Sequence, residues 1–429
     1  MERFRWNVYA DQPHNIASRK ERLKHHLKYG GSYLSLVSSN LRRAYPVLSL
    51  YRKYRERMYK EPSRIDSPFA VSASPTEDKN EEVVKNLKEI GVNKTLVRIP
   101  SWERKRLGLY ENFIELLVKS RFEVTIALLQ NRDDVLSPVR WQSFMKEVFS
   151  RFRLIVSFFE LGHAWNRTKW GVWDYQEYLK LATPALSLGH DQGVKLVGPA
   201  VIDFEFHLYP PVLKALPFDK VSSLLYVDRQ GAPENGQFGW TTAKKVALLK
   251  AIIDVCSQKG RDCWITEVNW PLKGTGKYSP ASGQPNVSED QQADYLVRYF
   301  VICLASGLVQ RIYWWQLVAP GYGLIDNRPK QWRCRPSFNA LKTLIKHLEG
   351  STFTQKIPDS SAEIYLFSKG EEDFALCWTN GPPYDYAFSR NVSRVLDREE
   401  KETPFFFDKV KITGSPKYVF FEDQLTQNR

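Results

Sequence analysis

Between residues 68 and 350 the sequence changes eight times from a short apolar or β-branched run to a helical pattern. Apolar residues at helical spacing fill the segments between the runs; 80–91 ends at a Gly, and 288–307 begins at a capping Ser. The runs that we expect to be strands are 68–74, 94–101, 123–130, 153–162, 195–202, 221–228, 263–270 and 311–318.

Eight strand-then-helix units over about 280 residues predict an α/β fold, a (β/α)8 barrel. A doubly wound sheet would also alternate in this way. It would usually carry a glycine-rich phosphate-binding turn after its first strand, and residues 68–80 contain none. The closed barrel is therefore the predicted fold.

Both ends of the chain depart from this alternation. After residue 350 the pattern changes to strands, with a hairpin expected over 362–381 and a second strand pair over 408–423 with its turn at Gly414. Before residue 63, bases interleave with large apolar residues. We predict a basic helical arm (1–62), a barrel (63–350) and a small C-terminal antiparallel, β-sandwich-like domain (351–429).

The net charge of +14 is concentrated in the arm. Residues 1–60 contain fourteen Lys or Arg and four Asp or Glu, which gives +10 there and +4 in the rest of the chain. Bases interleaved with apolar residues favour an anionic surface such as inner-leaflet lipid or an acidic glycolipid. A solvated arm without a partner is the alternative. We expect no nucleic acid, because no binding motif accompanies the charge.

The cysteines and the apolar runs indicate in which cellular compartment the protein is found. Five Cys, an odd number without metal-ligand spacing, indicate reduced thiols. The N-terminal residues lack the apolar core of a signal peptide, and no apolar run approaches the ~20 residues of a membrane span. We therefore predict a cytoplasmic protein, peripheral on the inner membrane face through its arm, with no metal and no other cofactor.

Chemistry in a (β/α)8 barrel takes place where the strands end at their carboxyl edge. In this sequence the strand ends carry a ring of mainly polar and aromatic side chains. In strand order the ring is Arg98; Gln130; His163, Ala164 and Asn166; Asp203 and Glu205; Tyr226, Asp228 and Arg229; Glu267; and Trp314, Trp315 and Gln316.

Four motifs at these strand ends resemble those of the clan A glycoside hydrolases, retaining enzymes built on this barrel. "LVRIPSWE" contains Arg98, "LLYVDR" contains Tyr226, "ITEVNW" contains Glu267, and "YWWQL" contains Trp314 and Trp315. The stretch "GYGLIDNRPKQWRCRPSFNAL" also resembles the family's approach to its last helix. The resemblance covers residues 68–423, including the C-terminal domain.

The resemblance implies that Glu267 is the nucleophile. Arg98 would keep it ionised and oriented, and Tyr226 would donate to its other oxygen. A retaining enzyme places a second carboxyl about 5–5.5 Å away to protonate the leaving oxygen. The substrate-binding residues that we expect around this centre are Gln130, Trp165, Asn166, Asp228, Arg229, Trp314 and Trp315.

The fourth strand departs from the family pattern E-I-G-N-E-P-N. In "FELGHAWN", Glu160 aligns with the first Glu, His163 with the Asn, and Ala164 with the acid/base Glu. Ala164 cannot donate a proton, and such protonation typically contributes about 10²–10⁴-fold to the rate. We expect Ala164 to face the same cavity as Glu267, and Glu160 to be structural.

Three explanations remain open. Another group supplies the proton: Glu205, Asp203, Glu103, Asp228, or His163 as a weak acid. Alternatively, the barrel binds glycans or scaffolds partners without catalysis. In the third, the sugar donor carries a phosphate that leaves as a stable anion, and the bases near the rim (Arg167, Lys169 and Arg229) pair with it.

Carbohydrate recognition is common to all three explanations. We therefore predict a glycosidase-like enzyme, a glycosidase or transglycosidase, that acts on a glycan such as a bacterial surface polysaccharide or a glycolipid. A catalytically inactive glycan-binding pseudoenzyme is the alternative.

Overall fold

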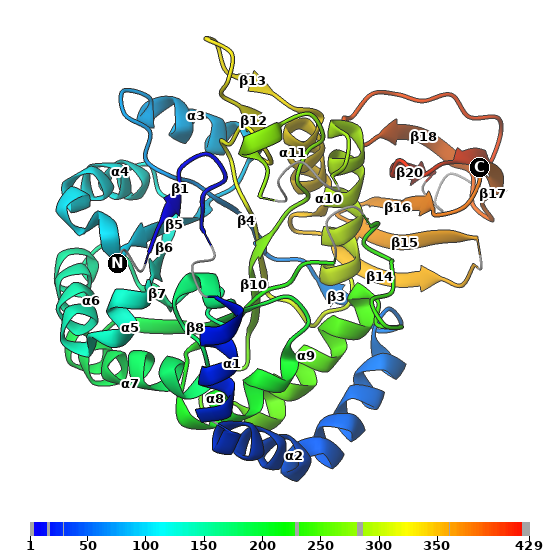
Figure 1. Ribbon diagram of the computed structural model, residues 1–429. Coiled ribbons are helices and arrows are strands. Elements are labelled where there is room, and N and C mark those ends of the chain that lie inside the picture. The colour runs from blue at the N-terminus through cyan, green and yellow to red at the C-terminus, as the bar shows by residue number, and fades with distance from the viewer. Residues whose placement is uncertain are drawn as a thin grey trace.

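The centre of the computed structural model is a closed barrel of eight parallel strands (Figure 1). The structure describes residues 4–14, 18–28, 30–227, 231–280, 286–359 and 361–422. Seven predicted runs each contain one barrel strand, and the run 221–228 overlaps a strand that begins one residue earlier, which confirms the predicted fold. The strands are β4 (Phe69–Ser72), β5 (Lys94–Pro100), β6 (Glu123–Leu129), β7 (Phe158–Leu161), β8 (Lys195–Ile202), β9 (Lys220–Leu224), β10 (Cys263–Val268) and β11 (Arg311–Trp314).

Helices surround the barrel, and their ends follow the expected capping chemistry. Gly91 ends α3 in the left-handed conformation, and Ser288 opens α10 in a reciprocal capping box with Gln291. The helices are α3 (Asn80–Ile90), α4 (Leu107–Lys119), α5 (Arg132–Leu136), α6 (Pro138–Phe152), α7 (Tyr175–Gln192), α8 (Tyr209–Ala215), α9 (Thr242–Cys256), α10 (Glu289–Leu304) and α11 (Pro336–Leu348). Shorter helical turns are η1 (Ser101–Arg106), η2 (Thr168–Trp170), η3 (Phe206–Leu208) and η4 (Gly276–Tyr278).

The fourth predicted strand, 153–162, begins too early in the prediction. The amides of Ile155 and Val156 both bond to the carbonyl of Phe152, which turns the backbone at the end of α6. Leu154 points outward and is 83% exposed. β7 therefore begins at Phe158. The prediction started too early because it counted Leu154, an exposed apolar residue of the turn, as part of the strand.

The C-terminal part contains a six-stranded sheet in the order β18-β20-β16-β15-β14-β3 and the two-stranded sheet β17-β19. The predicted hairpin over 362–381 is confirmed as the pair β15–β16. The strands are β3 (Ser63–Arg64), β14 (Thr352–Ile357), β15 (Ala362–Lys369), β16 (Glu372–Thr379), β17 (Tyr384–Ala387), β18 (Val392–Asp397), β19 (Lys409–Ile412) and β20 (Lys417–Phe421).

The strand pair predicted over 408–423 is wrong. β19 pairs with β17, whereas β20 lies between β16 and β18. Val410 and Ile412 of β19 share one buried apolar cluster with Val419 and Phe421 of β20. The two strands therefore meet across a core instead of along a common edge.

The other face of the six-stranded sheet packs toward the barrel. Because side chains alternate along a strand, Tyr365 and Phe367 of β15 point away from that cluster and join the main core. The edge strand β3 precedes the first barrel strand in the sequence, so the chain connects the two parts twice. The boundaries at residues 62 and 350 stay predictions.

The predicted helices of the arm are α1 (Arg19–Lys28) and α2 (Gly30–Arg57). α2 lies along the outside of α8 and α9 at the lower edge of Figure 1. The Asn40 amide donates to the carbonyl of His207 over 2.8 Å, and the Tyr54 hydroxyl donates to Asp254. These bonds, with buried Leu36 and Val47, fasten the arm to the barrel.

Residues 4–14 are not helical, which corrects the prediction for this part of the arm. They form a hairpin of β1 (Trp6–Asn7) and β2 (Gln12–Pro13). Within the described ranges, no helix is both long enough and apolar enough to cross a membrane. The five cysteines are unpaired.

Candidate active site

Glu267 ends β10 and meets two side chains from other strands. Arg98 of β5 donates through Nη2 to Glu267 Oε2, and Tyr226, just after β9, donates from its hydroxyl to Glu267 Oε1 over 2.5 Å. Arg98 and Glu267 are 8% and 7% exposed. Parallel strands of a barrel end at one edge, which is why residues so far apart in sequence converge here.

His163 lies beside this group, with its Nε2 3.6 Å from Glu267 Oε2. Burial, followed by the nearby charges of Arg98 and Lys169, lowers the pKa of His163 well below its usual range. The ring is therefore neutral at physiological pH. A neutral imidazole cannot serve as the imidazolium acid considered for this residue, although it can hydrogen-bond a substrate hydroxyl.

Trp315 follows β11 and stacks on the same arginine. The Arg98 guanidinium lies 3.2 Å from the centre of one Trp315 ring, and the Tyr322 ring is stacked at 6.5 Å. The side chain is 4% exposed and lines the cavity. Arg98 thus occupies one face of a ring that we predicted to bind substrate.

Three predicted substrate contacts are not among the residues that line this cavity. Trp314 is fully buried and stacks on Trp270 at 6.1 Å, because neighbouring residues of a strand point to opposite faces. Trp165 is also buried; it stacks on Tyr178 at 4.5 Å and donates to the Pro199 carbonyl.

Gln130 is the third, and its role is to hold the loop that follows β7. Its amide nitrogen donates to the carbonyls of His163 and Trp170, and its oxygen accepts from the His163 amide over 2.9 Å. Gln130 has no exposed surface, and its bonds position the backbone of His163.

Glu205 and Asn166 are committed to a polar cluster beside the cavity. Asn166 donates to Glu205 over 2.9 Å, and Arg167 binds Glu205 with one nitrogen and Asp203 with another at 2.6 Å. Asp203 and Arg167 line the cavity, whereas Glu205 and Asn166 line a smaller apolar pocket next to it. Glu205 is therefore paired with Asn166 and Arg167 and is not among the residues that line the cavity with Glu267.

Ala164, which we expected to face the cavity, is not among the residues that line it. It is fully buried inside the barrel, in one cluster with Ala127, Ala200 and Trp170. Its φ of 41° lies in the left-handed region, which non-glycine residues rarely adopt. Asp228 and Arg229 lie outside the described residues. Glu160 is buried within β7, and burial raises the pKa of its carboxyl.

The cavity at these strand ends has a volume of about 350 Å³. Beside Arg98 and Glu267 it is lined by residues that the sequence did not indicate: Ala10, Asp11 and Gln12 of the N-terminal hairpin. The Tyr-Ala-Asp-Gln-Pro stretch has turn-forming residues, but nothing in it indicates contact with a barrel. In the described part of the chain, no three His, Cys, Asp or Glu side chains gather as a metal site would require.

Comparison with known proteins identifies the fold. No protein-family model and no curated protein matches the sequence. A family 39 glycoside hydrolase from Bacteroides cellulosilyticus WH2 superimposes with a TM-score of 0.66 at 15% identity, over 83% of this chain and 81% of that one.

Two further solved structures agree. A GH30 endoxylanase from Clostridium papyrosolvens C71 matches with a TM-score of 0.59 at 11% identity, over 85% of this chain and 98% of that one. A GH51 arabinofuranosidase from Xanthomonas axonopodis pv. citri matches with a TM-score of 0.57 at 11% identity, over 84% and 98%. At these identities the likeness shows a shared fold, and it confirms the glycosidase-like barrel predicted from the motifs.

Proposed function

We propose that this chain, whose barrel has the fold of clan A glycoside hydrolases, acts on a glycan with Glu267 as a retaining-type nucleophile. The observation that carries the proposal is the contact of Glu267 with both Arg98 and Tyr226 at the cavity. The guanidinium favours the carboxylate form, and the tyrosine hydroxyl orients its second oxygen. A bacterial surface polysaccharide or a glycolipid is the substrate class that we expect.

The test is covalent labelling. 2-Fluoro sugars with dinitrophenolate or fluoride leaving groups need little protonation, so Glu267 should form a stable glycosyl ester detectable by intact-protein mass spectrometry. Glu267→Gln should abolish the adduct. Glu111→Gln, which removes a carboxylate of an ion pair on the outer surface of α4, should leave it unchanged.

A glycan-binding protein without catalysis is the second candidate. The alanine at position 164, where the aligned motif has its acid/base carboxyl, favours it. No adduct across a broad panel, together with glycan binding that is unaffected by Glu267→Gln, would support this candidate. For transfer from a phosphate-activated donor, two of the three rim bases already bind protein groups: Arg167 binds Asp203 and Glu205, and Lys169 binds Gln12. The third, Arg229, lies outside the described residues.

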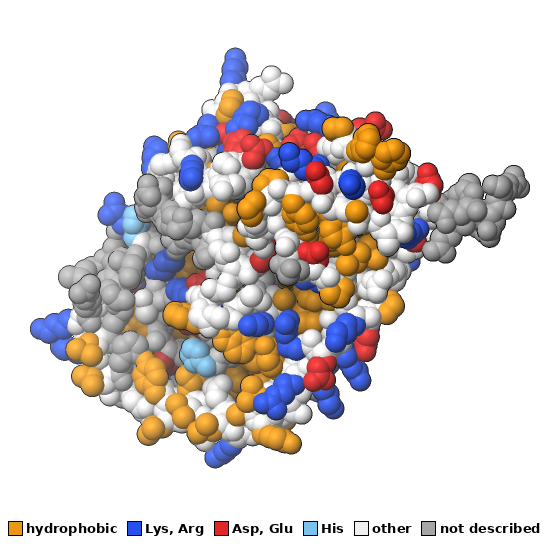
Figure 2. Space-filling model, turned by 90° about the vertical axis from the view of Figure 1, so that its right-hand side faces the viewer, with side chains coloured by type: hydrophobic (Ala, Val, Ile, Leu, Met, Phe, Trp, Pro, Cys, Tyr) orange, Lys and Arg blue, Asp and Glu red, His pale blue; other side chains and the backbone are white. Residues whose placement is uncertain are grey.

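The arm supplies the second part of the proposal, contact with an anionic membrane surface. Five exposed apolar side chains of α2 lie at helical spacing on one face: Leu34 (75% exposed), Val37 (54%), Leu41 (70%), Tyr45 (84%) and Leu48 (46%). Exposed Arg42, Arg52 and Lys53 accompany them. Figure 2 shows hydrophobic side chains with Lys and Arg beside them along the lower edge of the molecule, where α2 lies.

Co-sedimentation with vesicles of phosphatidylcholine and phosphatidylglycerol tests this contact. Binding should weaken as salt rises, and Val37→Ser with Leu41→Ser should reduce it at least about tenfold, because two apolar side chains no longer enter the interface. Leu154→Ser is the control, since that residue is more exposed than Val37 or Leu41 but lies outside α2. An equal loss for the control, or no loss for the double variant, would contradict the contact.

A further inference from the structure

The N-terminal hairpin lies at the mouth of the barrel and is held there from several sides. The Trp6 ring is 5.0 Å from Trp102, which follows β5, and 6.0 Å from Trp170, which follows β7. Gln12 accepts from Lys169 over 2.5 Å and donates to the carbonyl of Pro280 over 2.9 Å. Figure 1 shows β1 in dark blue beside β5.

This hairpin brings a carboxyl to Arg98. Asp11 Oδ2 lies 3.7 Å from Arg98 Nη1, while Nη2 of the same guanidinium binds Glu267. The Tyr322 hydroxyl donates to Asp11 over 3.5 Å. Arg98 therefore lies between the two carboxyls, and both carboxyl residues line the same cavity.

The backbone conformation at Asp11 is one that an aspartate can adopt while its carboxyl lies beside Arg98. Its φ is 50°, in the left-handed region that Asp and Asn adopt more readily than other side-chain-bearing residues. The side chain is 34% exposed and lines the cavity, so it can reach a ligand. In contrast, the buried Ala164 leaves the position expected for a catalytic carboxyl without one.

We propose that Asp11 is the general acid and base of this site, a role that rests on the proposed function of Glu267. As Glu267 attacks the anomeric carbon, the bond to the leaving oxygen breaks, its electron pair stays on that oxygen, and Asp11 gives its proton to it. The resulting Asp11 carboxylate then takes a proton from water. The water oxygen bonds to the anomeric carbon, and the ester electrons return to Glu267.

The surroundings of Asp11 favour the protonated form that the first step needs. Desolvation raises the pKa of Asp11, and the Glu103 carboxylate adds to this, whereas Arg98 and the Tyr322 hydroxyl act in the opposite direction. The other charged side chain that contacts the hairpin here is Lys169, which donates to the side chain of Gln12, the residue after Asp11. An acid with a raised pKa suits proton transfer near neutral pH.

The experiment uses the sugar whose 2-fluoro derivative labels Glu267. Asp11→Asn keeps the shape and tolerates the left-handed backbone. Turnover of the phenyl glycoside should fall about 10²–10⁴-fold, because phenolate needs a proton to leave. Labelling by the 2-fluoro dinitrophenyl glycoside should be unchanged. Azide, a nucleophile that needs no base, should restore turnover of the dinitrophenyl glycoside and yield the glycosyl azide.

Asp78→Asn is the matched control, because Asp78 is also left-handed, with φ 61°, but is exposed away from the cavity. It should change none of these rates. Labelling of Glu267 combined with unchanged or faster phenyl glycoside turnover in Asp11→Asn would overturn the role of Asp11 alone. Absence of labelling by every sugar would overturn the proposed function and this role with it.

Discussion

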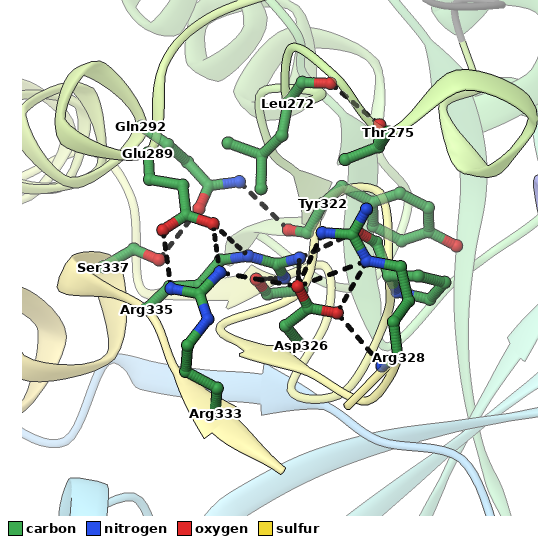
Figure 3. Close-up of polar contacts among 12 residues, drawn as sticks. Leu272, Thr275, Glu289, Gln292, Tyr322, Asp326, Arg328, Arg333, Arg335 and Ser337 are labelled. Carbon is green, nitrogen blue, oxygen red and sulfur yellow. Dashed lines mark hydrogen bonds and ion pairs between the residues drawn. The ribbon is translucent and has the colours of Figure 1, made fainter. Parts of the chain in front are cut away.

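Two buried arginines of this barrel, Arg335 and Arg98, bind carboxylates in opposite ways. Arg335, which precedes α11, has no exposed surface, and Figure 3 shows it between Glu289 and Asp326. Its Nε donates to Glu289 over 3.1 Å, and its Nη2 lies 3.2 Å from Asp326. Its remaining bonds go to the carbonyls of Ala319, Pro320 and Gly323. Every side of this guanidinium meets protein.

Arg98 has fewer partners and faces a cavity. Its contacts are Glu267, Asp11 and the Trp315 ring, and all four residues line the same space. A guanidinium whose N–H groups all bind protein, as in Arg335, holds the surrounding loops together. A guanidinium that faces a cavity, as in Arg98, leaves charged groups where a ligand can contact them. The same residue type therefore stabilises the structure in one place and prepares chemistry in the other.

The largest expected effect is a loss of stability when Arg335, whose N–H groups all bind protein, is replaced. Arg335→Met should lower the free energy of unfolding by about 3–5 kcal/mol, because Asp326 and three carbonyls would lose a buried partner. Urea titration followed by circular dichroism measures this. Arg394→Met, which breaks an exposed pair with Glu372, should cost less than about 1 kcal/mol. Similar losses for both variants would remove the distinction.

The same substitution at Arg98, which faces the cavity, should mainly reduce the reactivity of Glu267. Arg98→Met should slow labelling of Glu267 by about 10²–10³-fold, because a preorganised charge beside the nucleophile is lost. The loss of unfolding free energy should be smaller than for Arg335→Met, since water in the cavity can hydrate the remaining carboxylates. Labelling at the wild-type rate would contradict the assignment of Arg98.

A smaller effect is expected in the pH dependence of stability, through the ionisation of Asp326. Burial opposes ionisation of Asp326, but hydrogen bonds from Arg328 and the charges of Arg335 and Arg328 outweigh it and lower its pKa from 3.8 to about 2. Ionised Asp326 thus stabilises the fold above about pH 4, by roughly 2 kcal/mol, and this contribution is lost as the pH falls through about 2. Asp326→Asn should be less stable than wild type at pH 7, and the difference should shrink toward pH 2. A difference independent of pH would contradict this.

The sequence predicted the barrel and part of the site because both depend on local patterns. Strand and helix periods, with caps such as Ser288, define the elements, and each strand's own motif places Arg98, Tyr226 or Glu267 at the barrel's carboxyl edge. These three side chains meet because parallel strands end together. The predicted roles of Arg98 and Glu267 now depend on the labelling experiments.

Tertiary structure decided what the patterns left open. Whether Trp314 or Trp315 reaches the cavity depends on which side of β11 each one occupies, and the burial of Ala164 depends on packing inside the barrel. Asp11 comes to Arg98 from outside the barrel, through aromatic and polar contacts of a hairpin with distant loops. A local pattern records how the backbone repeats, but long-range packing selects which side chains meet, and for this reason the carboxyl beside Arg98 became visible only in the fold.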